Sequence, residues 1–341
     1  MDILQLITDR DRLDFSQNLS VTRNYMGDTL FPDEKTQNLE AEYLRLSDGL
    51  QLPTMAMVHG FDTEAAIGDR PELERVRIEK LLIKEKINQS ERVQMYLNKG
   101  VSEESALIGY VFDDMGRLAE SVKTRTEVAK MEVIATGKMT VKENNLNFAL
   151  DYDVPKSNFK NVDWSSAEAD ILGDIQDMID TAKALGKTVN RAVTSNKIVA
   201  LMRKNKGIQT AINGVNGIGT FVTLTKINEL LTEMFGITVS TNDDMYQYKK
   251  TNGAKATEYY FPRDRFSLMS AGVNGGVGTG LWGVTPEEAE YGQYSEKSAD
   301  QYITITQWAT PDPVAVWTKA SGLFVPVLPD PAGLIIATVK M

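Results

Sequence analysis

The sequence contains no cysteine and a single histidine, His59, among its 341 residues. Without cysteine, the chain can form no disulfide framework, no thiolate metal site and no cysteine nucleophile. A histidine-based catalytic triad or metal site has one candidate in the whole chain, and His59 lies in a glycine-containing stretch that is typical of an exposed loop tip. We therefore expect no catalytic residue, no metal site and no bound cofactor.

Long apolar runs and an excess of positive charge are also missing. No window approaches the ~18 apolar residues of a membrane span, and the acids near the N-terminus do not fit the basic region of a secretory signal. Lysine and arginine total 37 against 47 acids, which gives a formal net charge of −10. This balance argues against a basic face that reads nucleic-acid sequence, and it suits a surface to which DNA does not adhere. We expect no membrane partner.

Two kinds of local pattern could still carry chemistry. Residues 278–283 match G-x-G-x-x-G by letter, but Pro286 and an acidic turn follow instead of a helix, so we expect a flexible loop and no dinucleotide site. Adjacent acids point in different directions on a helix or strand, so we interpret each adjacent pair as solvated surface. These pairs are Asp113-Asp114, Asp243-Asp244 and Glu287-Glu288.

One long helix is predicted over residues 102–136. Ser102 can cap its N-terminus, and Gly137 can adopt the left-handed conformation that ends helices. At about ten turns, such a helix must lie across a sheet or a neighbouring subunit. Apolar residues recur along this helix at three- and four-residue steps and form one stripe, which consists of Ile108, Val111, Met115, Leu118, Val122, Ala129 and Val133. Glu120 and Lys123 lie outside this stripe, so we expect their replacement to cost little stability.

The part before this helix has few residues that could form a core. Residues 1–37 are interpreted as an arm that needs a neighbour to pack on, and residues 38–90 as a long two-stranded excursion. Its return leg, residues 72–87, would suit either a strand or a helix. A hairpin of this length with little core is marginal by itself, so we expect it to lie on another subunit. Its tip contains His59, Phe61, Asp62, Arg70 and Pro71.

The part after the helix has a different pattern. A hairpin is predicted over residues 139–150, with its turn at Asn144 and Asn145. Helices and short strands then alternate, which is typical of a mixed α/β lobe. Late strands split by Pro311 and Pro313 indicate that the first and last parts of the chain share one sheet. The helices expected in the lobe cover residues 165–186, with Ser165 or Ser166 as the cap, and then 196–205 and 224–236.

Several runs together resemble a known family over essentially the whole chain. They are AKMEVIATGKMTV (129–141), NNLNFALDYDVP (144–155), FPRDRFSLMS (261–270), GLWGVTPEEAE (280–290) and WATPDPVAVWTKASGLFVPVLPDP (308–331). The chain resembles the major capsid proteins of tailed bacteriophages, in the family typified by the lambda coat protein E. The resemblance implies an α+β protein with the tailed-phage (HK97-like) capsid fold and a structural, non-enzymatic function.

The resemblance also implies a division of the chain and a set of partners. The expected parts are an N-terminal arm (1–37), an extended loop (38–90), a peripheral domain (91–160 and 298–321) and an axial domain (161–297 and 322–341). The expected partners are further copies of the chain, as pentamers and hexamers, together with a portal protein and a decoration protein. A separate scaffolding protein is also expected, because the sequence begins directly at the arm. The shell would enclose double-stranded DNA without reading its sequence, and would be assembled in the bacterial cytoplasm.

Two alternatives differ in what the protein would contain or do. A shell protein of an encapsulin-type nanocompartment would have the same fold and enclose a cargo enzyme. A carboxylate-dependent hydrolase would rest on an acid pair that only the fold brings together.

Overall fold

The computed structural model describes residues 23–46, 73–90, 104–143, 146–250, 253–291, 296–297, 302–312 and 314–341. The chain forms two compact units. The first unit comprises Met1–Ala41, Arg77–Val128 and Thr279–Val327, and the second comprises Glu42–Val76, Ala129–Gly278 and Leu328–Met341. These bounds differ from the four parts that the resemblance implies, and that division stays a prediction.

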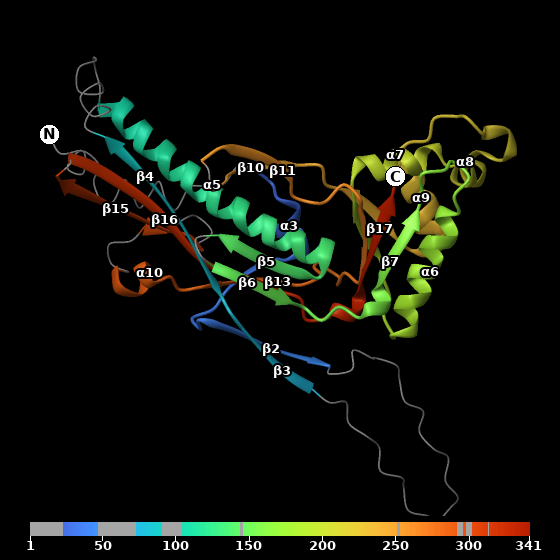
Figure 1. The fold of residues 1–341 in the computed structure, drawn as a ribbon, viewed down its shortest axis with the longest axis horizontal. Helices are drawn as coiled ribbons and strands as arrows, with labels where there is room; N and C mark the ends of the chain where they lie inside the picture. Colours follow the sequence, from blue (N-terminus) through green and yellow to red (C-terminus); the bar gives the residue numbers. More distant parts are fainter. Residues whose placement is uncertain are drawn as a thin grey trace, which may run out of the picture. The chain divides into compact units, whose positions relative to one another are not determined.

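The first unit is built around a six-stranded sheet. Its order is β1-β13-β16-β15-β14, and β4 pairs with the long strand β16 (Figure 1). The sheet therefore combines early and late parts of the chain, as the sequence indicates. The unit also contains the short helices α3 (Met26–Leu30) and α10 (Pro286–Tyr291). The strands are β1 (Asp33–Lys35), β4 (Leu81–Ser90), β13 (Thr279–Gly283), β14 (Glu296–Lys297), β15 (Thr304–Pro311) and β16 (Val314–Val327).

The long helix α5 (Glu104–Thr136) ends where the sequence predicts. Gly137 has φ +70°, and its N–H donates to the Val133 carbonyl at 2.8 Å, which closes the last turn. Val122 lies against β16, because a Cβ added at Gly322 would be 3.1 Å from its Cγ1 atom. The side chains of Ile108 and Val111 lie outside the described residues. The other members of the stripe, Met115, Leu118, Val122, Ala129 and Val133, are buried.

A second face of α5 is also buried, and this contradicts one expectation. Lys123 is only 6% exposed and Glu127 only 2%, whereas Glu120 is about half exposed, as expected. Lys123 and Glu127 are separated by about one helical turn and lie roughly 100° and roughly 140° around the helix from Val122 of the apolar stripe. The premise that Lys123 is a surface residue, on which the expected low cost of its replacement rested, is therefore wrong.

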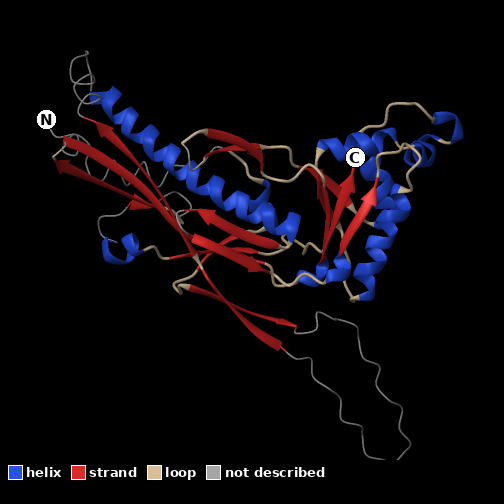
Figure 2. Cartoon of the chain, viewed as in Figure 1, coloured by secondary structure: helices blue, strands red, loops and turns tan. Residues whose placement is uncertain are grey.

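The second unit contains a five-stranded sheet with helices α6 to α9 packed on one face (Figure 2). Phe266 and Leu268 of β12 face these helices, whereas Ser267 faces the opposite side and donates its hydroxyl to the Ile134 carbonyl of α5 at 2.9 Å. The order of the sheet is β7-β17-β12-β8-β9. Its strands are β7 (Phe159–Asp163), β8 (Arg191–Thr194), β9 (Thr238–Thr241), β12 (Arg265–Met269) and β17 (Leu334–Lys340), and its helices are α6 (Ile171–Ala184), α7 (Asn196–Lys204), α8 (Lys206–Asn213) and α9 (Leu224–Phe235).

The helices of this unit agree with the sequence except in two respects. Asp170 caps α6 by accepting from the Gly173 N–H at 2.9 Å, because Ser165 instead hydrogen-bonds Asp163 and Ser166 accepts from Glu168. The helix α8 was not predicted. Gly236 ends α9 with φ +70°, as expected.

The remaining strands form three two-stranded ribbons. The predicted hairpin is β5 (Lys138–Glu143) with β6 (Leu146–Asp151), and a further hairpin joins β10 (Met245–Lys249) to β11 (Lys255–Tyr259). The third ribbon pairs β2 (Glu40–Leu46) with β3 (Leu73–Glu79). Both β3 and β4 are strands, which resolves the ambiguity of the return leg.

The glycine-rich match at 278–283 is not the flexible loop that we expected. Residues Thr279–Gly283 form β13, which pairs in parallel with β1 and antiparallel with β16. Trp282 is fully buried there. Gly283 leaves space for a neighbour, because a Cβ at this position would lie 2.6 Å from Leu323 Cδ2. Gly283 therefore serves packing within a sheet.

Candidate functional site

The second buried face of α5 holds residues 25–38, which we call the anchored segment. Tyr25, Leu30 and Phe31 of this segment are buried. The Glu127 carboxylate accepts the Gly27 backbone N–H at 3.0 Å from each oxygen, and it thereby satisfies one of the free donors at the start of α3. The Tyr25 hydroxyl lies 3.0 Å from Thr124 Oγ1. This part of the predicted arm thus packs on its own chain.

A buried ion pair lies at the centre of this contact. Lys123 Nζ lies 2.8 Å from Asp33 Oδ2, and both side chains are less than one-tenth exposed. The same ammonium lies 5.6 Å from the ring centre of Trp282 and 5.7 Å from that of Tyr302, and these two rings stack. A desolvated ion pair of this kind contributes little net stability but makes the loss of one partner costly. It therefore fixes where the anchored segment sits.

Backbone pairing extends the contact along the segment. Asp33, Glu34 and Lys35 pair in register with residues 280–282 of β13. Lys35 Nζ lies 2.9 Å from Glu288 of α10. Lys80 donates to Thr36 and to the Asn38 carbonyl, and burial lowers the pKa of its ammonium. The segment is thus attached at successive points from Tyr25 to Asn38.

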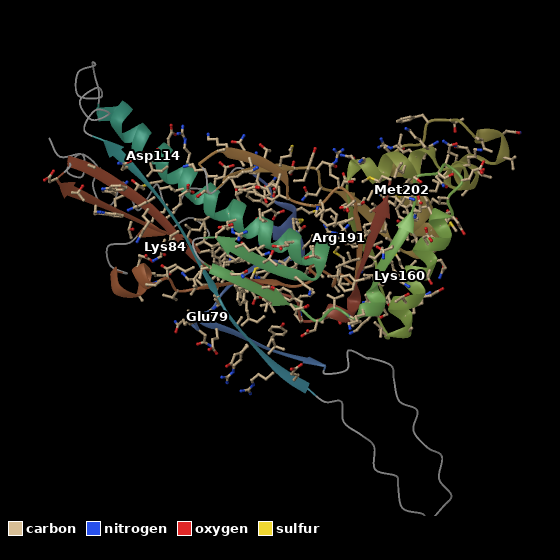
Figure 3. All side chains as sticks on the ribbon, in the orientation of Figure 1. Glu79, Lys84, Asp114, Lys160, Arg191 and Met202 are labelled. Carbon is tan, nitrogen blue, oxygen red and sulfur yellow. The ribbon has the colours of Figure 1, made fainter. Side chains whose placement is uncertain are left out.

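A second charged cluster joins α10 to the sheet. Glu287 Oε1 lies 2.7 Å from Lys319 Nζ and 3.0 Å from Lys84 Nζ, and Ser321 donates to Oε2 at 3.1 Å. Figure 3 labels Lys84, which comes from β4. Burial by itself raises the pKa of Glu287, but the hydrogen bonds from Lys319 and Lys84 outweigh it and lower the pKa to about 2. Glu287 is therefore a buried, ionised link between α10, β4 and β16.

The adjacent acid pairs have separate tasks. Glu287 and Glu288 bind different lysines, and Asp243 accepts the Asn196 backbone N–H at 2.7 Å at the start of α7. Asp114 and Glu287 are buried, which contradicts the solvated-surface interpretation for these two residues. Within the described parts of the chain, no group of three or more His, Asp or Glu side chains could hold a metal ion. In the same parts, no helix is long and apolar enough to span a membrane.

The predicted inter-subunit residues lie outside what the structure describes. His59, Phe61, Asp62, Arg70 and Pro71 all belong to the undescribed stretch between β2 and β3. Sequence reasoning missed the anchored segment, because Lys123 and Glu127 at a four-residue spacing are typical of a solvated, salt-bridged helix face. The signal that was available is Tyr25, Leu30 and Phe31, which are three large residues close together in a segment that we expected to have no core.

Comparisons with known proteins connect this architecture to a family. A model described as phage major capsid protein E matches residues 14–339. A comparison with curated proteins found no match. Among solved structures, a putative prophage capsid protein of E. coli aligns with TM-score 0.59 and 17% identity, over 100% of this chain and 99% of that one.

Two further structures support the same fold. A phage-related protein of Bordetella bronchiseptica aligns with TM-score 0.57 and 10% identity, over 95% and 96% of the two chains. The mature capsid of bacteriophage PhiM1 aligns with TM-score 0.51 and 9% identity, over 93% and 88%. The predicted α+β, HK97-like capsid fold is confirmed. The match over residues 14–339 shows that the chain belongs to the phage major capsid protein E family, structural and non-enzymatic proteins that self-assemble into the capsid of the virion.

Proposed function

We propose that the chain builds an icosahedral phage head from pentamers and hexamers that enclose double-stranded DNA. The observation that carries this proposal is the family match, which extends over nearly the whole chain. The net charge of −10 supports a passive lining, because proteins that hold DNA do so through basic surfaces that neutralise its phosphates.

The part of the predicted extended loop (38–90) that we propose to lie on a neighbouring subunit is residues 40–79, because β4 (Leu81–Ser90) pairs with β16 in the chain's own sheet. The described side chains of the β2–β3 ribbon support this role, since most of them are charged and exposed. Only Ala41 and Ile78 are buried there. A two-stranded ribbon with so little buried surface is marginal in isolation and gains stability by packing on another molecule. The exposed residues are Glu40, Glu42, Glu74, Arg75, Arg77 and Glu79.

The predicted arm is narrower in this proposal than in the sequence interpretation. Residues 25–37 are attached to their own helix and sheet by Glu127, Lys123 and β13. The inter-subunit part of the arm is therefore proposed to be residues 1–22, with the anchored segment as its fixed base.

The remaining partners follow from the family resemblance. We expect scaffolding and portal proteins during assembly in the bacterial cytoplasm, and a decoration protein on the finished shell. The proposed peripheral domain is 91–160 with 298–321, and the proposed axial domain is 161–297 with 322–341. Co-expression with each candidate partner and sedimentation of the resulting particles would test these associations one at a time.

Deletion of residues 58–71 tests the extended loop directly. The subunit should remain folded by circular dichroism, with a melting temperature close to that of the parent, and particle formation should be lost. A matched control replaces the same residues with a glycine–serine linker of equal length, which separates the chemistry of the tip from its length. Normal particles from the deletion variant would contradict a contact role, and an unfolded subunit would place the tip in a domain core.

A further inference from the structure

The turn between α8 and α9 places large apolar side chains in solvent. Val215 is 74% exposed, Ile218 49% and Phe221 78%. These residues fall within residues 214–223, which we call the apolar loop. Most exposed apolar residues on a protein are scattered singly, so three within seven positions indicate a contact surface.

Hydrogen bonds of Gln209 and Thr220 hold the apolar loop in a defined conformation. The buried Gln209 accepts the Gly219 N–H at 2.9 Å and donates to the Arg203 carbonyl at 2.9 Å. The Thr220 hydroxyl donates to the Gly217 carbonyl at 2.6 Å. A loop that is fixed by its own hydrogen bonds presents its apolar residues without an ordering cost on binding.

Arg203 lies beside Phe221 of the apolar loop and adds a positive charge there. It lies at the end of α7 next to the buried Met202, which Figure 3 labels. Its guanidinium lies 5.8 Å from the ring centre of Phe221. The Nε atom is buried and has no hydrogen-bond partner, and no carboxylate pairs with this residue within the described part of the chain. The loop thus combines apolar contact with an arginine that lacks an acid.

The C-terminal half of α9 exposes acidic and apolar side chains, which complement the positive charge of Arg203 and the apolar loop. Met234 is 50% exposed, and Glu229 and Glu233 are exposed, with no ion pair to another described residue. Met234 lies ten positions after Leu224, which is about 15 Å along the helix, so this end cannot meet the apolar loop of its own chain. The same molecule therefore carries a basic apolar surface and a separate acidic apolar surface.

We propose that the apolar loop and Arg203 of one subunit bind the Glu229–Glu233–Met234 end of α9 on a second copy of this chain. Because the two surfaces differ, the contact is head-to-tail, and it generates a ring when the rotation from one copy to the next closes on itself, as a pentamer or hexamer requires. Arginine and exposed aromatic residues are the types that dominate binding at such interfaces. The inference rests on the proposed function, since a ring of copies is a capsomer, and it names the surfaces that meet.

The absence of cysteine allows a direct test by site-specific cross-linking. In the full chain, Phe221→Cys and Met234→Cys are introduced together, and assembled particles are treated with a short bismaleimide. We expect a ladder of covalent oligomers on a denaturing gel that ends at five or six subunits. Each single variant should stay monomeric, because a head-to-tail contact brings together two different positions. A second pair, Val215→Cys with Glu233→Cys, should give the same ladder if the first pair impairs folding.

A matched control pairs Phe221→Cys with Asp180→Cys, an exposed position on α6, and should give no ladder. The inference is overturned if particles form but both test pairs stay monomeric, or if the control pair cross-links equally well. Efficient dimers from Phe221→Cys alone would also overturn it, since loop would then meet loop. Absence of any particle or oligomer would instead count against the proposed function.

Discussion

The helix α5 buries two faces that differ in chemistry. Met115, Leu118 and Val122 form an apolar face, and Val122 meets β16 at Gly322. Lys123 and Glu127 lie about a third of a turn away and form a polar face that holds the anchored segment. Apolar contacts are non-directional, whereas an ion pair and a hydrogen-bonded carboxylate each demand one particular partner.

This difference indicates a division of tasks within one helix. The apolar face supplies stability to the first unit, because burial of such side chains is worth about 1.5–3 kcal/mol each. The polar face supplies little net stability, but it selects the position of residues 25–38. The predictions below separate these two tasks, beginning with the largest expected effect.

Leu118→Asp should be the most damaging change, with a loss of about 4 kcal/mol or more in the free energy of unfolding. It places an unpaired charge in a fully buried apolar contact. Glu120→Ala is the matched control on the same helix, and it should change the free energy by about 0.5 kcal/mol or less. Denaturant unfolding of both variants decides this, and similar losses would mean that the apolar face is not where the stability lies.

Lys123→Met should cost about 3–5 kcal/mol, because Asp33 is left buried without its cation. The double variant Lys123→Met with Asp33→Leu should recover most of that loss. A double-mutant cycle by denaturant unfolding measures the coupling. If the double variant is no more stable than the single one, the ion pair contributes stability as well as position.

Gly322→Ala should cost about 1–3 kcal/mol through overpacking. The new Cβ would lie 2.8 Å from Trp282 Cζ3 and 3.1 Å from Val122 Cγ1. Gly272→Ala is the control, because its nearest neighbour would be 3.7 Å away. Thermal unfolding compares the two, and an unchanged melting temperature for Gly322→Ala would mean that α5 and β16 separate easily.

The Glu287 cluster should make the stability of the protein depend on pH in the acid range. Its pKa is lowered from the ordinary 4.5 to about 2, so its contribution is fully present above pH 4.5 and is lost as the pH falls toward about 2. Glu287→Gln should therefore flatten the dependence of stability on pH in this window. Melting temperatures from pH 6 to pH 2 test this, and parallel curves for parent and variant would contradict it.

Local patterns predicted most of the elements. Gly137 and Gly236 ended their helices with positive φ as expected, and the apolar periodicity of residues 171–182 predicted α6. The strand β13 was missed because its glycines resemble a loop, and only pairing with β1 and β16 makes it a strand.

The site was harder to predict than the fold for a physical reason. Lys123 becomes buried only because Asp33, 90 positions earlier in the chain, reaches it. The sequence around Lys123 and Asp33 does not indicate that they are buried, since a lysine outside an apolar stripe is ordinarily solvated. Tertiary pairing of charges is a property of the folded chain and has no period in the sequence.

Sedimentation velocity of the full chain, co-expressed with a candidate scaffolding protein, tests the central claim most directly. We predict large particles of uniform size, whose inventory contains this chain as the main component and no co-purifying cargo enzyme. A chain that stays monomeric at high concentration under these conditions would contradict a shell-forming function.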